Sequence, residues 1–143
     1  MCGIVGYMGY RKAAPIVLKG LQRIEYRGYD SAGIALYDNK EVTLYKTQGK
    51  VANLAALANF NTATQNIAIG HMCWAIHGVP SDANAHPHTS NSGELVLIHN
   101  GIIENYDALK AVLVGKGYVF HFDTDTEVLV NLIEDVQKVT IIN

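Results

Sequence analysis

The chain has 143 residues, of which 49% are hydrophobic and 17% are charged, and its formal net charge is −2. This length suits one domain or part of a larger one, and it allows a sizeable buried core. The small negative charge excludes a polybasic nucleic-acid binder and gives no attraction to anionic membranes. No apolar run approaches the ~20 residues of a membrane span, and the N-terminus lacks a signal-peptide pattern. We therefore expect a cytoplasmic protein that binds neither nucleic acid nor membranes.

The first half of the chain alternates predicted strands and helices. Apolar runs bounded by glycine or polar residues predict strands, whereas apolar residues at helical spacing predict helices. The predicted strands are 2–8, 31–37, 42–46 and 66–70, and the predicted helices are 13–24 and 51–58. Pro15 suits the first turn of helix 13–24. A polar turn at 38–40 predicts that the strands on either side of it form a hairpin.

The second half of the chain begins with a long polar segment, 79–93, which predicts a functional loop. The elements predicted after it are strand 94–99, helix 105–114, strand 118–122 and helix 128–136. Asn105 is the predicted N-cap of the first of these helices, and Gly115 and Gly117 are predicted to end it. Residues 124–127, Thr-Asp-Thr-Glu, form a capping-box pattern that opens the last helix. The mixture of hairpins and helices predicts an α+β or layered α/β protein.

Cys2 stands directly after Met1, at the start of the first predicted strand. Removal of Met1, which is usual before a small residue, would give Cys2 both a thiol and an α-amine of ordinary pKa about 8. The amine would then take the thiol proton directly or through water, as histidine does in a Cys–His pair. The alternative is a small buried cysteine in a strand. With Cys73 the count is two, too few for a disulfide framework, and both are compatible with free thiols.

An Asn-Gly pair, Asn100-Gly101, lies between a predicted strand and a predicted helix. The Asn100 side-chain amide and the Gly101 backbone N–H can both donate hydrogen bonds to a developing oxyanion. Two preorganised donors are typical of an oxyanion hole, and the loss of one costs about 3–4 kcal/mol. An ordinary Asn-Gly turn is the alternative.

Histidine and cysteine side chains gather between residues 71 and 88, where they are His71, Cys73, His77, His86 and His88. These side chains are ligands of transition metals in many proteins. The segment has no Cys-x-x-Cys pair, however, and its four-residue histidine spacing lies on no evident helix. We therefore predict loop and supporting histidines rather than a metal site, and we expect no metal or other cofactor.

Five motifs together carry a resemblance to a known family. They are Cys2-Gly-Ile-Val-Gly, Glu25-Tyr-Arg-Gly-Tyr-Asp-Ser-Ala-Gly33, Asn84-Ala-His-Pro-His88, His99-Asn-Gly-Ile-Ile-Glu-Asn105 and Thr124-Asp-Thr-Glu127. In this order they resemble class II glutamine amidotransferases, from Cys2 to about residue 137. The motif at 84–88 favours the members that aminate a sugar phosphate over those that depend on phosphoribosylpyrophosphate.

The resemblance implies an α+β fold of the N-terminal-nucleophile hydrolase type, a four-layer αββα sandwich of antiparallel sheets that is incomplete at its C-terminal end. Residues 1–143 would form a partial glutaminase domain, which hydrolyses the glutamine side-chain amide to glutamate and ammonia. The ammonia would pass to an isomerase domain, absent from these residues, that uses fructose 6-phosphate. That missing domain would also carry the contact of a homodimer.

The resemblance also assigns roles to single residues. The implied catalytic group is Cys2 as nucleophile with its α-amine as base, Asn100 and Gly101 as oxyanion hole, and Arg27 as support for the N-terminal cysteine. The implied glutamine contacts are Asp125 to the α-amino group, and Trp74 and His77 in the loop that closes over the substrate.

The substrate loop departs from the family pattern at three positions. The family motif reads Gly-His-Thr-Arg-Trp-Ala-Thr-His-Gly, whereas the chain has Met72, Cys73 and Ile76 at the first Thr, the Arg and the second Thr. The family arginine pairs with the glutamine α-carboxylate through a two-bond fork, which a thiol cannot make. An unpaired carboxylate costs about 3–4 kcal/mol, or two to three decades in affinity. Ile76 also removes a hydroxyl from the substrate pocket, so we expect impaired glutamine binding.

Two other functions remain open at this point. A catalytically dead glutaminase-fold domain could serve as a structural or binding module, because retention of Met1 would acylate the Cys2 amine and remove the base. A metal-binding protein that uses the histidines and cysteine of residues 71–88 is the other.

Overall fold

The computed structural model of the chain describes residues 2–28, 30–38, 41–73 and 84–141. They fall into two compact units, Met1–Pro87 and His88–Asn143, each of which has its own sheet and helices. Across these described ranges, no helix is both long enough and apolar enough to span a bilayer.

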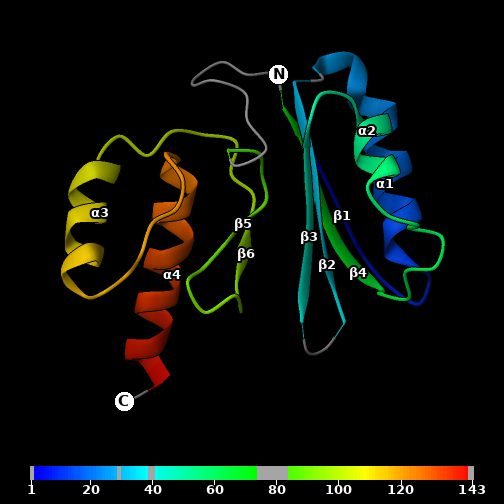
Figure 1. Cartoon of the computed structure of the whole chain (residues 1–143). Coiled ribbons are helices and arrows are strands. Elements are labelled where there is room, and N and C mark those ends of the chain that lie inside the picture. The colour runs from blue at the N-terminus through cyan, green and yellow to red at the C-terminus, as the bar shows by residue number, and fades with distance from the viewer. Residues whose placement is uncertain (1, 29, 39–40, 74–83, 142–143) are drawn as a thin grey trace. The chain divides into compact units, whose positions relative to one another are not determined.

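The first unit is built on a four-stranded antiparallel sheet with the strand order β1-β4-β2-β3 (Figure 1). Its strands are β1 (Gly3–Met8), β2 (Ser31–Tyr37), β3 (Val42–Gln48) and β4 (Ile67–Cys73). The predicted hairpin is confirmed, with Ser31 of β2 opposite Gln48 of β3. In the middle of the sheet β4 pairs with both β1 and β2, and it extends beyond the predicted 66–70 to Cys73. The central strand β4 therefore carries Met72 and Cys73, two of the residues that differ from the family motif.

Two helices, α1 (Ala13–Ile24) and α2 (Val51–Ala56), cover one face of this sheet (Figure 1). Both predicted helices are confirmed, and α1 has the predicted bounds. The helix-facing strand residues alternate with those of the other face, as strand geometry requires. Together with α1 and α2 they form the core, which contains Val17, Leu21, Ile34, Leu36, Leu54 and Met72. Each large side chain buried there contributes roughly 1.5–3 kcal/mol relative to exposure.

The opposite face of the sheet carries Gly33, His71 and Cys73, because Gly33 lies opposite His71 in the β2–β4 register. A Cβ atom at Gly33 would overlap the carbonyl oxygen of His86. The glycine in the buried strand thus allows the segment before residue 88 to lie directly on this face, next to His71.

The second unit contains a short antiparallel ribbon and two helices. Its elements are β5 (His88–Thr89), β6 (Val96–Leu97), α3 (Tyr106–Gly115) and α4 (Asp125–Ile141). The predicted strand 94–99 is confirmed only at residues 96–97, and its partner β5 falls inside the segment predicted as a loop. The prediction of a strand at 118–122 is wrong. The N–H groups of Val119, His121 and Phe122 donate to the side chains of Asn91 and Glu127 at 2.8–2.9 Å, not to a neighbouring strand.

The helix ends of this unit follow the sequence signals in most respects. Gly117, at φ 93°, permits the closing bond from the Tyr118 N–H to the Leu113 carbonyl at 3.0 Å. Asn105 occupies the predicted N-cap position, but its side chain makes no capping hydrogen bond. Thr124 does cap α4, since its Oγ1 accepts the Glu127 N–H at 3.2 Å. Because that cap precedes Asp125, α4 begins earlier than the predicted residue 128, and it also ends later.

Candidate active site

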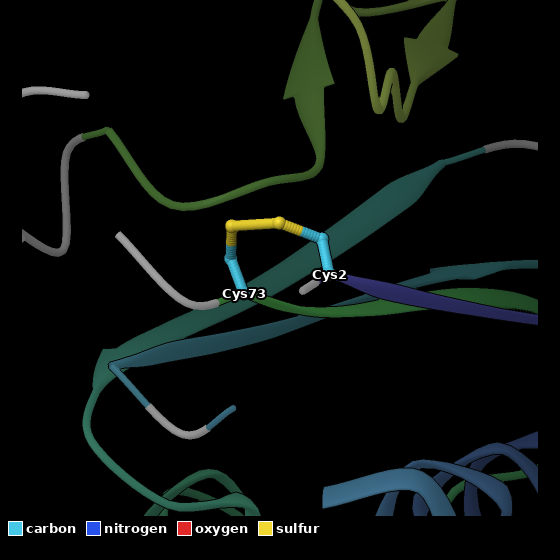
Figure 2. Close-up of a disulfide and its surroundings, with 2 residues drawn as sticks. All are labelled: Cys2 and Cys73. Atoms are coloured by element: carbon cyan, nitrogen blue, oxygen red, sulfur yellow. A yellow bond between two sulfur atoms is a disulfide. The ribbon is translucent and has the colours of Figure 1, made fainter. Parts of the chain in front are cut away.

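Cys2 and Cys73 lie opposite each other at one end of the β1–β4 pair. The register that places Gly3 opposite Met72 brings the next pair, Cys2 and Cys73, face to face. Their Cα atoms are 4.1 Å apart and their sulfur atoms form a disulfide (Figure 2). The sequence allowed two free thiols, but in this state of the chain the two cysteines are bonded to each other. Strand pairing joins cysteines that are 71 positions apart in the sequence.

The disulfide has a direct chemical consequence for Cys2. The nucleophile of a cysteine enzyme is the thiolate, and a disulfide sulfur carries no such charge. Cys2 regains a thiolate only after the bridge takes up two electrons from a reductant, through thiol–disulfide exchange or an equivalent reaction. The structure is therefore that of an oxidised, unreactive form of this residue.

His71 lies beside the two cysteines on the same face of the sheet. It is two residues before Cys73 on β4, and its side chain is buried, with 1% exposed. The ligand atoms of Cys2, His71 and Cys73 all lie within 4.8 Å of one another. The ring of His86 packs against that of His71, with centroids 4.7 Å apart. This end of the sheet thus gathers two sulfur atoms and two imidazoles.

This group differs from the metal-ligand set weighed from the sequence. His71 and Cys73 do lie close together, as that set requires. The third member of the group is Cys2, which lies outside residues 71–88 and was not part of the set. His88 belongs to the second unit, where its Nε2 contacts Thr124 Oγ1 at 3.2 Å. His77 lies outside the described residues.

The charged motif at residues 25–33 holds the surroundings of Cys73 in place. Asp30 donates its N–H to the Cys73 carbonyl at 2.9 Å and accepts the Gly49 N–H at 2.8 Å. Glu25 accepts the N–H of Val51 at 2.7 Å, which satisfies a free donor at the start of α2. The capping role of Glu25 was not predicted, because its partner lies 26 positions away.

Arg27 lies in the same motif. It ends the short 3₁₀ helix η1 (Glu25–Arg27), and its side chain is exposed. Among the described residues, the predicted site residues of the first unit are therefore Cys2, Arg27 and Cys73.

The second unit holds Asn100, Gly101 and Asp125. Asn100 and Gly101 are exposed and lie between β6 and α3. Asp125, the first residue of α4, accepts the Ile103 N–H at 2.7 Å through Oδ2, which ties it to the segment that carries the Asn-Gly pair. A Cβ atom at Gly101 would come within 2.5 Å of His99 Nε2, so glycine permits the close approach of that ring. The remaining predicted residues, Trp74, Ile76 and His77, lie outside the described residues.

A buried polar row on α4, which the sequence analysis did not predict, anchors the β5–β6 turn. Asn131 Oδ1 accepts the Asn91 N–H at 2.8 Å, and Glu134 Oε2 accepts the Ser92 hydroxyl at 3.0 Å. Glu134 also forms an ion pair with Lys138. Burial by itself raises the pKa of Glu134, but hydrogen bonds from Lys138, Ser90 and Ser92 outweigh it and lower the pKa to about 2. The i, i+4, i+7 spacing of Glu127, Asn131 and Glu134 places them on one helix face, and this pattern could have predicted the polar row from the sequence.

The chain is similar to known proteins at the levels of both sequence and structure. A family profile described as a glutamine amidotransferase domain matches residues 58–141. Glutamine–fructose-6-phosphate aminotransferase (isomerizing) from Bacteroides thetaiotaomicron is 59% identical over 135 residues, covering 94% of this chain and 22% of the relative. The enzyme of the same name from Chlorobaculum tepidum is 55% identical over 141 residues, covering 96% of this chain and 23% of the relative. The chain thus spans about a fifth of the length of these curated relatives.

Two solved structures share the fold. The glutamine phosphoribosylpyrophosphate amidotransferase from B. subtilis, complexed with ADP and GMP, matches with a TM-score of 0.77 and 31% identity over 94% of this chain and 29% of its own. An allosteric regulatory enzyme of purine biosynthesis matches with a TM-score of 0.79, at the same identity and coverage. The predicted α+β fold of the N-terminal-nucleophile type is thereby confirmed.

Proposed function

The chain belongs to the glutamine amidotransferase domain family, and from that premise we propose that it hydrolyses the side-chain amide of glutamine to glutamate and ammonia, with Cys2 as the nucleophile. The observation that carries the proposal is the position of Cys2 directly before β1 in a chain with this fold. A cysteine at that place has its thiol and, once Met1 is removed, its α-amine on the same residue.

The first step of the proposed reaction is the release of Cys2 from its disulfide. The Cys2–Cys73 bridge takes two electrons and two protons from a dithiol, which becomes a disulfide, and both cysteines become thiols. The free α-amine of Cys2 then accepts the thiol proton. The thiolate attacks the amide carbon of glutamine and a tetrahedral oxyanion forms. The Asn100 amide and the Gly101 N–H donate hydrogen bonds to it.

The second half of the reaction transfers the proton to the leaving group and regenerates the free enzyme. The C–N bond breaks as the protonated α-amine gives its proton to the leaving nitrogen, so ammonia departs and a thioester remains on Cys2. The amine then takes a proton from water, the resulting hydroxide equivalent attacks the thioester carbon, and glutamate and the Cys2 thiol are released. No oxidant, metal or further cofactor is needed for this cycle.

Substrate binding is the weak part of the proposed site. Asp125 would hold the glutamine α-amino group, and it is anchored to the Asn-Gly segment by the Ile103 N–H. Cys73 stands where the family pattern has an arginine, so the substrate α-carboxylate would lack its charged partner. Ile76 likewise replaces a threonine. We expect glutamine binding to be weakened by about 3–4 kcal/mol, two to three decades in KM, relative to a chain with the family residues.

We extend the proposal to the longer protein that the relatives represent. They are named for transfer to fructose 6-phosphate, and the similarity favours the same acceptor for the ammonia made here. Residues 1–143 would then be part of the amidotransferase domain of a homodimeric cytoplasmic enzyme that makes an amino sugar.

A glutaminase assay on dithiol-reduced protein tests the proposal, after intact-mass measurement has established that Met1 is absent. We expect weak turnover in the parent, none in Cys2→Ser, and a KM lowered about 100- to 1000-fold in Cys73→Arg, because the guanidinium restores the carboxylate partner. Ile76→Thr should lower KM further. Since both positions serve one ligand, their effects should not add simply.

Two results would contradict the proposal. Ordinary glutamine affinity in the unmodified chain would show that Cys73 does not occupy the carboxylate position. An inert Met72→Thr, Cys73→Arg, Ile76→Thr triple variant, reduced and with a free Cys2 amine, would favour a catalytically dead module.

A further inference from the structure

We propose that the reduced chain binds one Zn²⁺ ion through Cys2, His71 and Cys73, and that this binding competes with the glutaminase reaction for the Cys2 thiolate. The two cysteines and the histidine are brought together by the β1–β4 register and by the two-residue repeat of β4. Cys2 precedes His71 by 69 positions in the sequence and Cys73 by 71. Only the paired strands make them a group.

The distances between the ligand atoms fit a tetrahedral ion. A Zn–S bond of about 2.3 Å and a Zn–N bond of about 2.0 Å place neighbouring ligand atoms of a tetrahedron roughly 3.5–3.8 Å apart. The sulfur and nitrogen atoms of the three side chains already lie within 4.8 Å of one another. Reduction separates the bonded sulfur atoms toward the spacing that the ion needs. Both cysteines are partly exposed, so after reduction their side chains can rotate while the strand pairing keeps their Cα atoms opposite each other.

The chemistry of the three side chains selects a soft or borderline cation. Thiolates favour Zn²⁺ and Cu⁺ over Mg²⁺ and Ca²⁺, and imidazole suits zinc equally well. Two thiolates, one neutral imidazole and Zn²⁺ give a site of zero net charge, which suits a place where His71 has only 1% of its surface exposed. Three protein ligands leave a fourth position open for water, as in zinc sites with a Cys₂His set.

Three states of the same sulfur atoms exclude one another. The disulfide form has no thiolates that could bind a metal. In the zinc form the Cys2 thiolate is bound to the ion. Only in the reduced, metal-free form is the Cys2 thiolate free to react. Zinc would therefore shield Cys2 from electrophiles and protect the pair from oxidation. Unlike catalysis, binding does not require removal of Met1, so this proposal and the proposed function can fail separately.

A titration with Co²⁺, followed by displacement with Zn²⁺, tests the site. The chain is reduced with a phosphine, which takes its oxygen from water and leaves two thiols, and the phosphine is removed under argon. We expect one Co²⁺ per chain with thiolate-to-metal charge-transfer absorption, lost when Zn²⁺ is added. Zn²⁺ should also slow alkylation of Cys2 by iodoacetamide at least about tenfold. The untreated disulfide form should show no absorption band.

Variants assign the ligands. Cys73→Ser should halve the charge-transfer intensity and weaken binding at least about tenfold, since even loss of a residue that only supports a ligand costs ~10–100-fold. His71→Asn should weaken binding with the intensity per bound ion retained, and circular dichroism checks that this buried variant is folded. His121→Ala, an exposed histidine of the second unit, is the matched control and should bind like the parent. Absence of the band in the reduced parent, or a band unchanged in Cys73→Ser, would overturn the proposal.

Discussion

The Cys2–Cys73 disulfide should stabilise the chain while it blocks the residue proposed to react. The bridge joins positions 71 apart, so it closes a long loop in the unfolded chain. The chain-entropy relation gives about 4 kcal/mol for a loop of this length, and measured bridges typically contribute about 2–4 kcal/mol. We therefore expect reduction to lower the free energy of unfolding by about 2–4 kcal/mol. For a chain of this size the midpoint should fall by roughly 4–16 °C.

The assay compares thermal unfolding of untreated and phosphine-reduced protein, with thiols counted under denaturing conditions in the same samples. Untreated chains should show no reactive thiol, and reduced chains should show both. Cys73→Ser is the matched control, because it lacks the bridge but keeps the size of the side chain. Its midpoint should equal that of the reduced parent, and the phosphine should not change it.

Either of two results would refute this reasoning. Two reactive thiols in protein purified without reductant would mean that the register does not lead to a bond. A bridge that forms without changing the unfolding midpoint would mean one of two things. Either the loop is already constrained in the unfolded chain, or the bridge destabilises the folded chain by as much free energy as it adds to the unfolded one.

Three further predictions follow from buried or positioned residues. Glu134→Gln should cost about 1–3 kcal/mol at pH 7, because the carboxylate pKa of about 2 is below the usual 4.5. In the parent this stability is complete above pH ~4.5 and is lost as the pH falls toward 2, so acid unfolding should be less steep in the variant. Met72→Thr should lower the unfolding free energy by roughly 1–3 kcal/mol and leave the glutamine KM unchanged, because Met72 is fully buried under the helices. In the Cys73→Arg background, Asn100→Ala should lower kcat about 100-fold with little change in KM, as expected of an oxyanion donor, and a raised KM at constant kcat would contradict that role.

Local patterns predicted the first unit well where the backbone groups of an element are satisfied within it or by the next element in the chain. Helix 13–24 combines a well-placed proline with apolar residues at one spacing, and α1 has those bounds. Strands 31–37 and 42–46 are joined by a short polar turn, so their pairing is nearly local. Prediction failed where distant side chains take up the backbone N–H groups. Residues 118–122 alternate like a strand, but Asn91 and Glu127 take up their N–H groups.

The candidate site shows the same division. Cys2 and the Asn100–Gly101 pair were found from position and neighbouring residues, whereas the bond between Cys2 and Cys73 depends on strand register. A shift of one residue would move a side chain to the other face of the sheet, and no feature of residues 71–78 alone specifies the register. The family motif predicted Cys73 in a substrate loop, but this residue is the last one of β4.

The residue at position 73 therefore affects more than the substrate contact that was predicted for it in a loop. An arginine there would supply a carboxylate partner and could form neither a disulfide nor a thiolate–metal bond. Cysteine removes the charge and, because Gly3 pairs with Met72, also places a second sulfur beside Cys2. If both proposals hold, one replacement would weaken glutamine binding, make Cys2 sensitive to oxidation and add a metal ligand. The same geometry explains why Cys73→Arg should reverse all three effects.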